Sequence, residues 1–220
     1  MAKASEKAYE LVRRRIIDGT YPPASRLTEK EIADSSGVSR TPVREALQQL
    51  QSEGFVQVTA NQGAVVVDWT ASDAVEVYEI RGLLEPYAAA RAAERATIAD
   101  IEELQALAEA QKNETESREP GHMERIGALN SQFHRKLLDC ARSTRLSIVM
   151  PMLIEAPLIM RMFTRYSDRQ LVRSAEHHIE IVAALRARDP EWAAAIMRTH
   201  IYAARTRALP DQSREEHLQD

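Results

Sequence analysis

Three histidines in the second half of the chain could together hold a metal ion. His134, His178 and His200 lie in three different segments with helical periodicity, so their imidazoles can converge inside a helical bundle. Asn130 precedes His134 by one helical turn, where its amide oxygen could act as a fourth donor. Because no short-range pattern such as His-x-x-x-His occurs, a purely structural role for the three histidines stays open.

A second chemical group lies near the N-terminus, where residues 39–47 read Ser-Arg-Thr-Pro-Val-Arg-Glu-Ala-Leu. In a helix that begins there, Arg40, Thr41, Arg44 and Gln48 share one arc that starts at the helix N-terminus. The planar fork of an arginine can bridge O6 and N7 of guanine or clamp a phosphate. This arc therefore has the chemistry of a helix that lies in a DNA groove.

The residues around this segment predict a helix-turn-helix. Thr28 and Glu31 stand in capping-box relation at the start of one helix, and Gly37 permits the sharp turn that follows it. Ser39 is expected to cap the second helix, and Pro42 falls in its first turn, where a missing N–H is tolerated. The buried stripe of that second helix is expected to contain Val43, Leu47 and Leu50.

After the second helix the apolar pattern changes to alternation. Residues 55–59 and 64–67 flank a turn over 60–63, which predicts a β-hairpin. A first helix is expected from Glu6 to Asp18. Residues 1–70 therefore predict a winged helix-turn-helix domain.

Only helices are expected in the remainder, so the predicted fold is mostly α, with an all-α helical bundle over residues 71–209. The expected helices are 73–95, one capped by Thr97 and Asp100, His122–Ala141, Arg145–Arg165, Asp168–Arg188 and Glu191–Ala208. A polar loop is expected over residues 113–121, and residues 210–220 are expected to form a flexible tail.

Composition limits the class of protein. A chain of 220 residues that is 44% hydrophobic can bury two cores. The single cysteine, Cys140, excludes an intrachain disulfide and favours a buried thiol. No apolar signal-peptide core begins the chain, and prolines and a glutamate interrupt its most apolar segment, so a cytoplasmic protein without a membrane span is expected. Residues 1–69 hold nine basic and nine acidic side chains, so any basic surface there must be local.

Residues 8–67 closely resemble the DNA-binding domain of the GntR family of bacterial transcription regulators. The resemblance rests on residues 17–19, Leu27, residues 38–47, Glu53, Gly54 and Gly63. It implies operator DNA as a partner. The implied contacts with the major groove and its phosphates are Lys30, Ser39, Arg40 and Arg44, and the implied wing contacts with the minor groove are Gln62 and Gly63. Ala24 departs from the family, whose members usually carry a glycine there.

Residues 72–209 resemble the all-helical effector domain, called FCD, of the FadR-type branch of that family. The matching features are residues 78–81, Glu85, Phe133, His134, His178 with Ile181 and Asp189, and residues 194–200. In metal-containing relatives an aspartate and three histidines are the ligands, and these map onto Asn130, His134, His178 and His200. Because Asn130 supplies a neutral oxygen, a weaker or differently selective site is expected. His177 is an adjacent alternative to His178.

The expected ion is a divalent transition metal such as zinc or nickel, whose open positions could coordinate a small carboxylate effector. Arg81 is a candidate second clamp on that carboxylate, and an internal pair with Glu85 at i+4 is the alternative. Arg161 and Arg165 would flank the pocket only if their proline-broken helix folds over it.

The sequence thus predicts a homodimeric, ligand-responsive transcription regulator, more specifically a repressor, that reads a near-palindromic operator and is not an enzyme. Two alternatives stay open. One is a DNA-binding dimer with structural histidines and a metal-free effector pocket. The other is a metal-dependent enzyme whose ion activates water.

Overall fold

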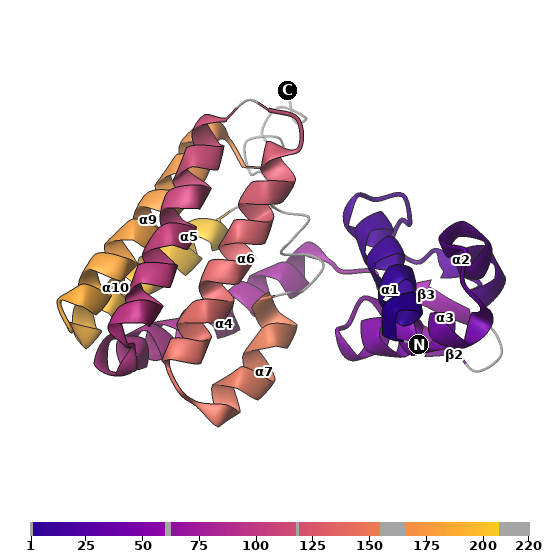
Figure 1. Ribbon diagram of the computed structural model, residues 1–220, viewed down its shortest axis with the longest axis horizontal. Coiled ribbons are helices and arrows are strands. Elements are labelled where there is room, and N and C mark those ends of the chain that lie inside the picture. The colour runs from indigo at the N-terminus through magenta and orange to yellow at the C-terminus, as the bar shows by residue number, and fades with distance from the viewer. Residues whose placement is uncertain (1, 60–62, 118, 155–165, 207–220) are drawn as a thin grey trace, which may run out of the picture. The chain divides into compact units, whose positions relative to one another are not determined.

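The computed structural model of the protein describes residues 2–59, 63–117, 119–154 and 166–206. Its chain divides into two compact units, one ending at Thr70 and the other beginning at Ala71 (Figure 1). The predicted wing contact Gln62, the arginines Arg161 and Arg165, and the predicted tail lie outside the described residues.

The N-terminal unit has the predicted winged helix-turn-helix fold. Its elements are α1 (Ala2–Ile17), β1 (Arg26–Leu27), α2 (Glu29–Ser36), α3 (Arg40–Ser52), β2 (Val56–Thr59) and β3 (Gly63–Val66). The sheet is antiparallel in the order β1-β3-β2. The alternating pattern identified β2 and β3, but β1 is too short to carry any pattern. Helix α1 begins at Ala2, four residues before the predicted Glu6.

Local chemistry at the turns agrees with the sequence with one exception. The capping box is present, since Thr28 Oγ1 accepts from the Glu31 amide and Glu31 Oε2 accepts from the Thr28 amide. Gly37 has a φ of +66°, as the sharp turn requires. Ser39 occupies the N-cap position of α3, but its side chain makes no capping hydrogen bond. Ala24 adopts a φ of +60°, the left-handed conformation that a glycine would adopt more readily.

One core fixes α3 within this unit. Val43, Leu47 and Leu50 are buried together with apolar residues of α1, α2 and the sheet. Burying three such side chains contributes on the order of 5 to 9 kcal/mol before entropy is counted. Because this face of α3 is fixed in the core, the opposite face, with Arg40 and Arg44, is directed towards solvent.

The C-terminal unit is a helical bundle, as predicted. Its described helices are α4 (Ala71–Arg95), α5 (Ile98–Glu116), α6 (His122–Cys140), α7 (Thr144–Ile154), α9 (Asp168–Arg186) and α10 (Pro190–Arg205). Helix α10 packs along α4, and α5 packs against both α6 and α9 (Figure 1). Among the described residues, no helix is both long and apolar enough to cross a membrane.

Capping groups explain where two of these helices begin. Thr97 and Asp100 form the predicted capping box of α5. Asp189 caps α10 by accepting from the Trp192 amide, with Pro190 in the first turn. The predicted loop begins later than expected, because α5 continues through Asn113 to Glu116 and the Ser117 amide still bonds to the Asn113 carbonyl.

Replacing Gly63 with alanine should destabilise the N-terminal unit. Gly63 has a φ of +87°, and a Cβ atom there would overlap the Leu27 carbonyl oxygen of β1. Gly19 has a φ of +83° but no atom within 4 Å of an added Cβ, so Gly19→Ala carries only the conformational cost of about 1 to 2 kcal/mol. In urea unfolding we expect Gly63→Ala to lose roughly 2 kcal/mol more than Gly19→Ala. Equal losses would contradict the close approach of β1 and β3.

Candidate metal centre and nucleic-acid surface

The predicted DNA-contact residues of α2 and α3 lie on the surface of the N-terminal unit, whereas the predicted wing residue Gly63 is buried. Ser39, Arg40, Thr41 and Arg44 are exposed on or just before α3, and Lys30 is exposed on α2. A hollow of about 250 Å³ joins α3 to the hairpin. Its lining residues are Glu29, Arg44, Leu47, Gln48, Val58, Thr59 and Gly63. The fold therefore brings the predicted helix contact Arg44 and the predicted wing residue Gly63 to one concave surface.

Arg44 is held in place by an acidic neighbour. Its Nε donates to Glu29 Oε1 at 2.7 Å, although 61% of its side chain is exposed. This hydrogen bond lowers the pKa of Glu29 and raises that of Arg44. With Nε engaged, the guanidinium keeps its terminal nitrogens for a second partner. Sequence reasoning missed Glu29, because no local pattern links residues that lie 15 positions apart.

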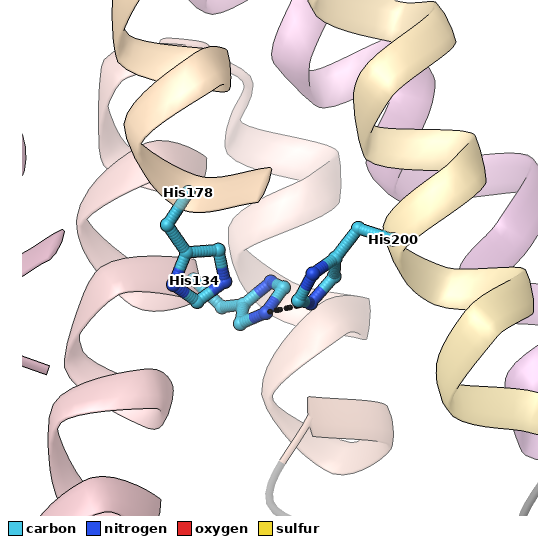
Figure 2. Close-up of side chains that lie close together, drawn as sticks. All are labelled: His134, His178 and His200. Carbon is cyan, nitrogen blue, oxygen red and sulfur yellow. Dashed lines mark hydrogen bonds between the residues drawn. The ribbon is translucent and has the colours of Figure 1, made fainter. Parts of the chain in front are cut away.

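The three predicted histidines meet inside the C-terminal unit. His134 comes from α6, His178 from α9 and His200 from α10, and their rings face one another (Figure 2). One donor atom from each lies within 4.8 Å of the others, and the Nε2 atoms of His134 and His200 are 3.2 Å apart. All three side chains are buried. The three ligand atoms are close enough together that they could hold one metal ion.

Two of these imidazoles have partners that fix their orientation. Nδ1 of His134 lies 2.5 Å from Glu85 Oε2, and Nδ1 of His178 lies 2.6 Å from Gln111 Oε1. Carboxylate and amide oxygens accept hydrogen bonds, so this network assigns the proton of each ring to Nδ1. The Nε2 lone pairs of His134 and His178 are then free for a cation, with His200 Nε2–H donating to His134 in its absence.

Two buried acceptor atoms, one on Asn130 and one on His178, have no hydrogen-bond partner among the described residues. Asn130 is buried one turn before His134, and its Oδ1 atom has no hydrogen-bond partner among the described residues. The Nε2 atom of His178 also lacks one. Each such atom costs about 1 to 3 kcal/mol. A cation held by the histidines would satisfy the Nε2 atom of His178, and three imidazoles suit a borderline divalent ion such as zinc or nickel.

A buried ion pair holds the carboxylate that bonds to His134. Arg81 Nε bonds to Glu85 Oε1 at 2.6 Å, and both side chains are almost fully buried. Burial by itself favours the neutral acid, but the charge of Arg81 and the hydrogen bonds that His134 and Arg81 donate outweigh burial and lower the pKa of Glu85 to about 2. Arg81 therefore makes the internal pair that was the alternative to its role as an effector clamp.

Burial also keeps two of the histidines neutral. Desolvation, followed by the effect of His134, lowers the pKa of His178 well below its usual value. Desolvation and the neighbouring His178 do the same for the pKa of His200. A neutral imidazole is the form that binds a metal ion, so the unit presents these side chains ready for coordination.

Sequence reasoning missed the groups that orient the histidines. Gln111 was not considered, and Glu85 was considered only as a partner of Arg81. Phe133 stacks on His178, with ring centroids 4.0 Å apart and planes inclined by 10°. A signal for Gln111 did exist, because it continues the buried stripe of α5 formed by Ile101, Leu104 and Ala108. A polar side chain at an apolar position of a buried stripe indicates a specific partner.

Comparison with known proteins gives matches to both units. Residues 4–66 match the gntR family of bacterial regulatory proteins, and residues 76–203 match the FCD domain. The chain is 34% identical to the Nta operon transcriptional regulator of Aminobacter aminovorans, covering 82% of this chain and 83% of that protein. It is also 34% identical to a probable D-xylose utilization operon transcriptional repressor of Paenarthrobacter nicotinovorans, covering 86% and 81%. The structure of McbR/YncC from Escherichia coli superposes with a TM-score of 0.76 at 26% identity, covering 92% and 95%.

Acidification should destabilise the metal-free C-terminal unit. Because the folded-state pKa values of His178 and His200 lie below 6.5, the unfolded chain takes up these protons first. The resulting stability is fully present above about pH 6.5 and is lost below it, by roughly 1.4 kcal/mol per pH unit for each histidine. Urea unfolding with a chelator at pH 8, 7, 6 and 5 measures this slope.

The double variant His178→Gln/His200→Gln should show a flatter dependence on pH, while His122→Gln, outside the cluster, should match the wild type. The same slope in the wild type and the double variant would contradict a neutral buried pair.

Proposed function

The chain belongs to the gntR family of bacterial regulatory proteins and carries an FCD domain, and from this premise we propose how its two units act together. The protein is a transcription regulator with an effector domain. We infer that it is a repressor, acting in the cytoplasm, whose operator affinity changes when a small carboxylate binds at a metal centre in the helical unit. One relative with 34% identity is named a probable repressor, which supports repression rather than activation.

The observation that carries this proposal is the buried histidine cluster. We propose that His134, His178 and His200 hold a divalent transition ion, with Asn130 as the fourth donor. Such an ion supplies Lewis-acid positions that a carboxylate can occupy. The chain supplies the neutral imidazoles, fixes their tautomers and excludes water from around them. The amide oxygen of Asn130 leaves the donor set uncharged, so a carboxylate would bring the charge that balances the ion.

Arg81 is the proposed second contact for an anionic effector. Its guanidinium has five N–H donors, and the bond to Glu85 uses Nε. A carboxylate near Arg81 would become its second anionic partner and would compete with Glu85 for the same charge. Because Glu85 also bonds to His134, this competition would reach the metal ligands directly. We propose that effector binding changes the metal ligands through the contacts from Arg81 to Glu85 and from Glu85 to His134.

In the N-terminal unit we propose that α3 enters the major groove and that the hairpin meets the minor groove. The proposed contacts are Lys30, Ser39, Arg40, Thr41, Arg44, Gln62 and Gly63. The exposure of the residues on α2 and α3 supports this assignment, as does the hollow shared by Arg44 and Gly63. Arg44 would read a base with the terminal nitrogens of a guanidinium that Glu29 holds through Nε.

We propose that a second copy of the chain completes the regulator. Leu83 and Tyr87 on α4 are 72% and 52% exposed, and Ile148 and Val149 on α7 are 63% and 49% exposed. Helices α4 and α7 pack against each other, so these large apolar side chains come from neighbouring elements. Exposed apolar groups of this size are typical of contact surfaces. Two winged helices in one dimer would read the two halves of a near-palindromic operator.

Arg44→Ala should weaken operator binding by about 1 to 3 kcal/mol, since a bidentate arginine contact with a base is lost. The operator can be obtained by enriching a random duplex library with the wild-type protein, and affinities for the enriched and shuffled duplexes can be measured by fluorescence anisotropy. Arg186→Ala removes the same charge from an exposed site on α9 and is the matched control. Unchanged discrimination in Arg44→Ala would exclude α3 as the reading helix.

Native mass spectrometry of untagged protein, purified without chelator, tests the metal centre and the dimer together. We expect two subunits per particle and one metal ion per subunit. His178→Ala should remove the ion, because a buried ligand is lost. His177→Ala should keep it, because this adjacent histidine does not belong to the cluster.

A metal-free wild type would leave the histidines structural, with a metal-free effector pocket. Loss of the ion in His177→Ala alone would instead assign the neighbouring histidine as the ligand. A monomer at micromolar concentration would contradict the proposed dimer.

A further inference from the structure

Gln111 is a buried polar residue on an otherwise apolar face of α5. Its side chain is fully buried, and Oε1 accepts a hydrogen bond at 2.6 Å from Nδ1 of His178. Its Nε2 atom has no partner among the described residues. A methionine or leucine would remove this unpaired donor, but it would also remove the acceptor of the His178 Nδ1 proton. The amide therefore leaves one donor unsatisfied in order to satisfy another, which belongs to a histidine of the cluster.

The same arrangement occurs on the other side of the cluster. Glu85 accepts from Nδ1 of His134, as Gln111 does from Nδ1 of His178. These two acceptors come from α4 and α5, whereas the histidines come from α6 and α9. An acceptor at Nδ1 holds the proton there and leaves the Nε2 lone pair for a cation. Phe133 stacks on the His178 ring and restricts its tilt. The stacking does not decide which ring nitrogen carries the proton, so that choice is left to the acceptor.

We propose that Gln111 is a positioning residue of the metal centre, which rests on the proposed metal-binding function. Gln111 keeps His178 in the Nδ1–H tautomer, so that the Nε2 atom, which is buried without a partner, can ligate the ion. Without this acceptor the proton can move to Nε2 and block coordination. Because an amide is a weaker acceptor than a carboxylate, Gln111 also makes His178 a weaker ligand than its counterpart His134, which is paired with Glu85.

Two substitutions at this position test the inference in the full-length chain. Gln111→Met keeps the length and helix propensity of the side chain but removes the acceptor, and Gln111→Glu strengthens the acceptor. Gln105→Met makes the same change on the same helix, at a residue that bonds to Glu109 and not to a histidine. The tautomer of His178 is read by ¹⁵N NMR of the metal-free protein. Zinc affinity is measured by competition with a chromophoric chelator.

We expect Gln111→Met to move the His178 proton to Nε2 and to weaken zinc binding by about 10- to 100-fold. Its thermal stability without metal should change little, because the lost hydrogen bond to His178 and the removal of the unsatisfied amide donor have opposite effects. Gln111→Glu should bind zinc at least as tightly as the wild type, and Gln105→Met should match the wild type in both measurements.

An unchanged tautomer in Gln111→Met, or a zinc affinity within about twofold of the wild type, would overturn the positioning role. If the wild type binds no zinc, the metal proposal fails, and the tautomer of the metal-free protein still decides whether Gln111 orients His178.

Discussion

The histidine cluster depends on a single carboxylate that is buried between two hydrogen-bond donors, one of them the Arg81 guanidinium. Glu85 contacts Arg81 through one oxygen and His134 through the other. A buried carboxylate is costly unless it is fully paired, and here the pairing is strong enough to lower its pKa to about 2. The same contacts join α4 to α6 and set the orientation of His134, the first of the proposed metal ligands. Stability and ligand orientation are therefore properties of one interaction.

Under the proposed function, this coupling would give the helical unit a means of responding to an anion. Helix α4 carries Arg81 and Glu85, follows directly on the N-terminal unit in sequence, and packs along α10, which carries His200. A carboxylate that drew on the charge of Arg81 would alter the partner of His134 and the helix that connects the two units. An effector shifts such an equilibrium only by its difference in affinity for two arrangements. In the proposed site, where Glu85 and the effector would share Arg81, the competition for one guanidinium would provide such a difference.

In both units an acidic or amide side chain orients the residue proposed to act. Glu29 holds Arg44 on the surface of the N-terminal unit, while Glu85 and Gln111 hold His134 and His178 in the interior. Exposure to solvent determines how much each of these contacts contributes to stability. The surface pair is screened by water and contributes little to stability, whereas the buried contacts lose a great deal if one partner is removed. All of these contacts orient a side chain, and only the buried ones also contribute strongly to the stability of the fold.

The sequence by itself determined the elements and the chemical types at the sites. Capping residues, glycines and apolar periodicity located the helix-turn-helix, the hairpin and the bundle, because these signals act within a few residues of one another. The histidines that cluster were also identified, although their spacing alone left a structural role open and resemblance was needed to favour a metal site. Tertiary structure decided which side chains stand behind them. Glu29 with Arg44, Glu85 with His134 and Gln111 with His178 pair across 15, 49 and 67 positions. Such pairings follow from how helices pack, and no local pattern in a single sequence records that packing.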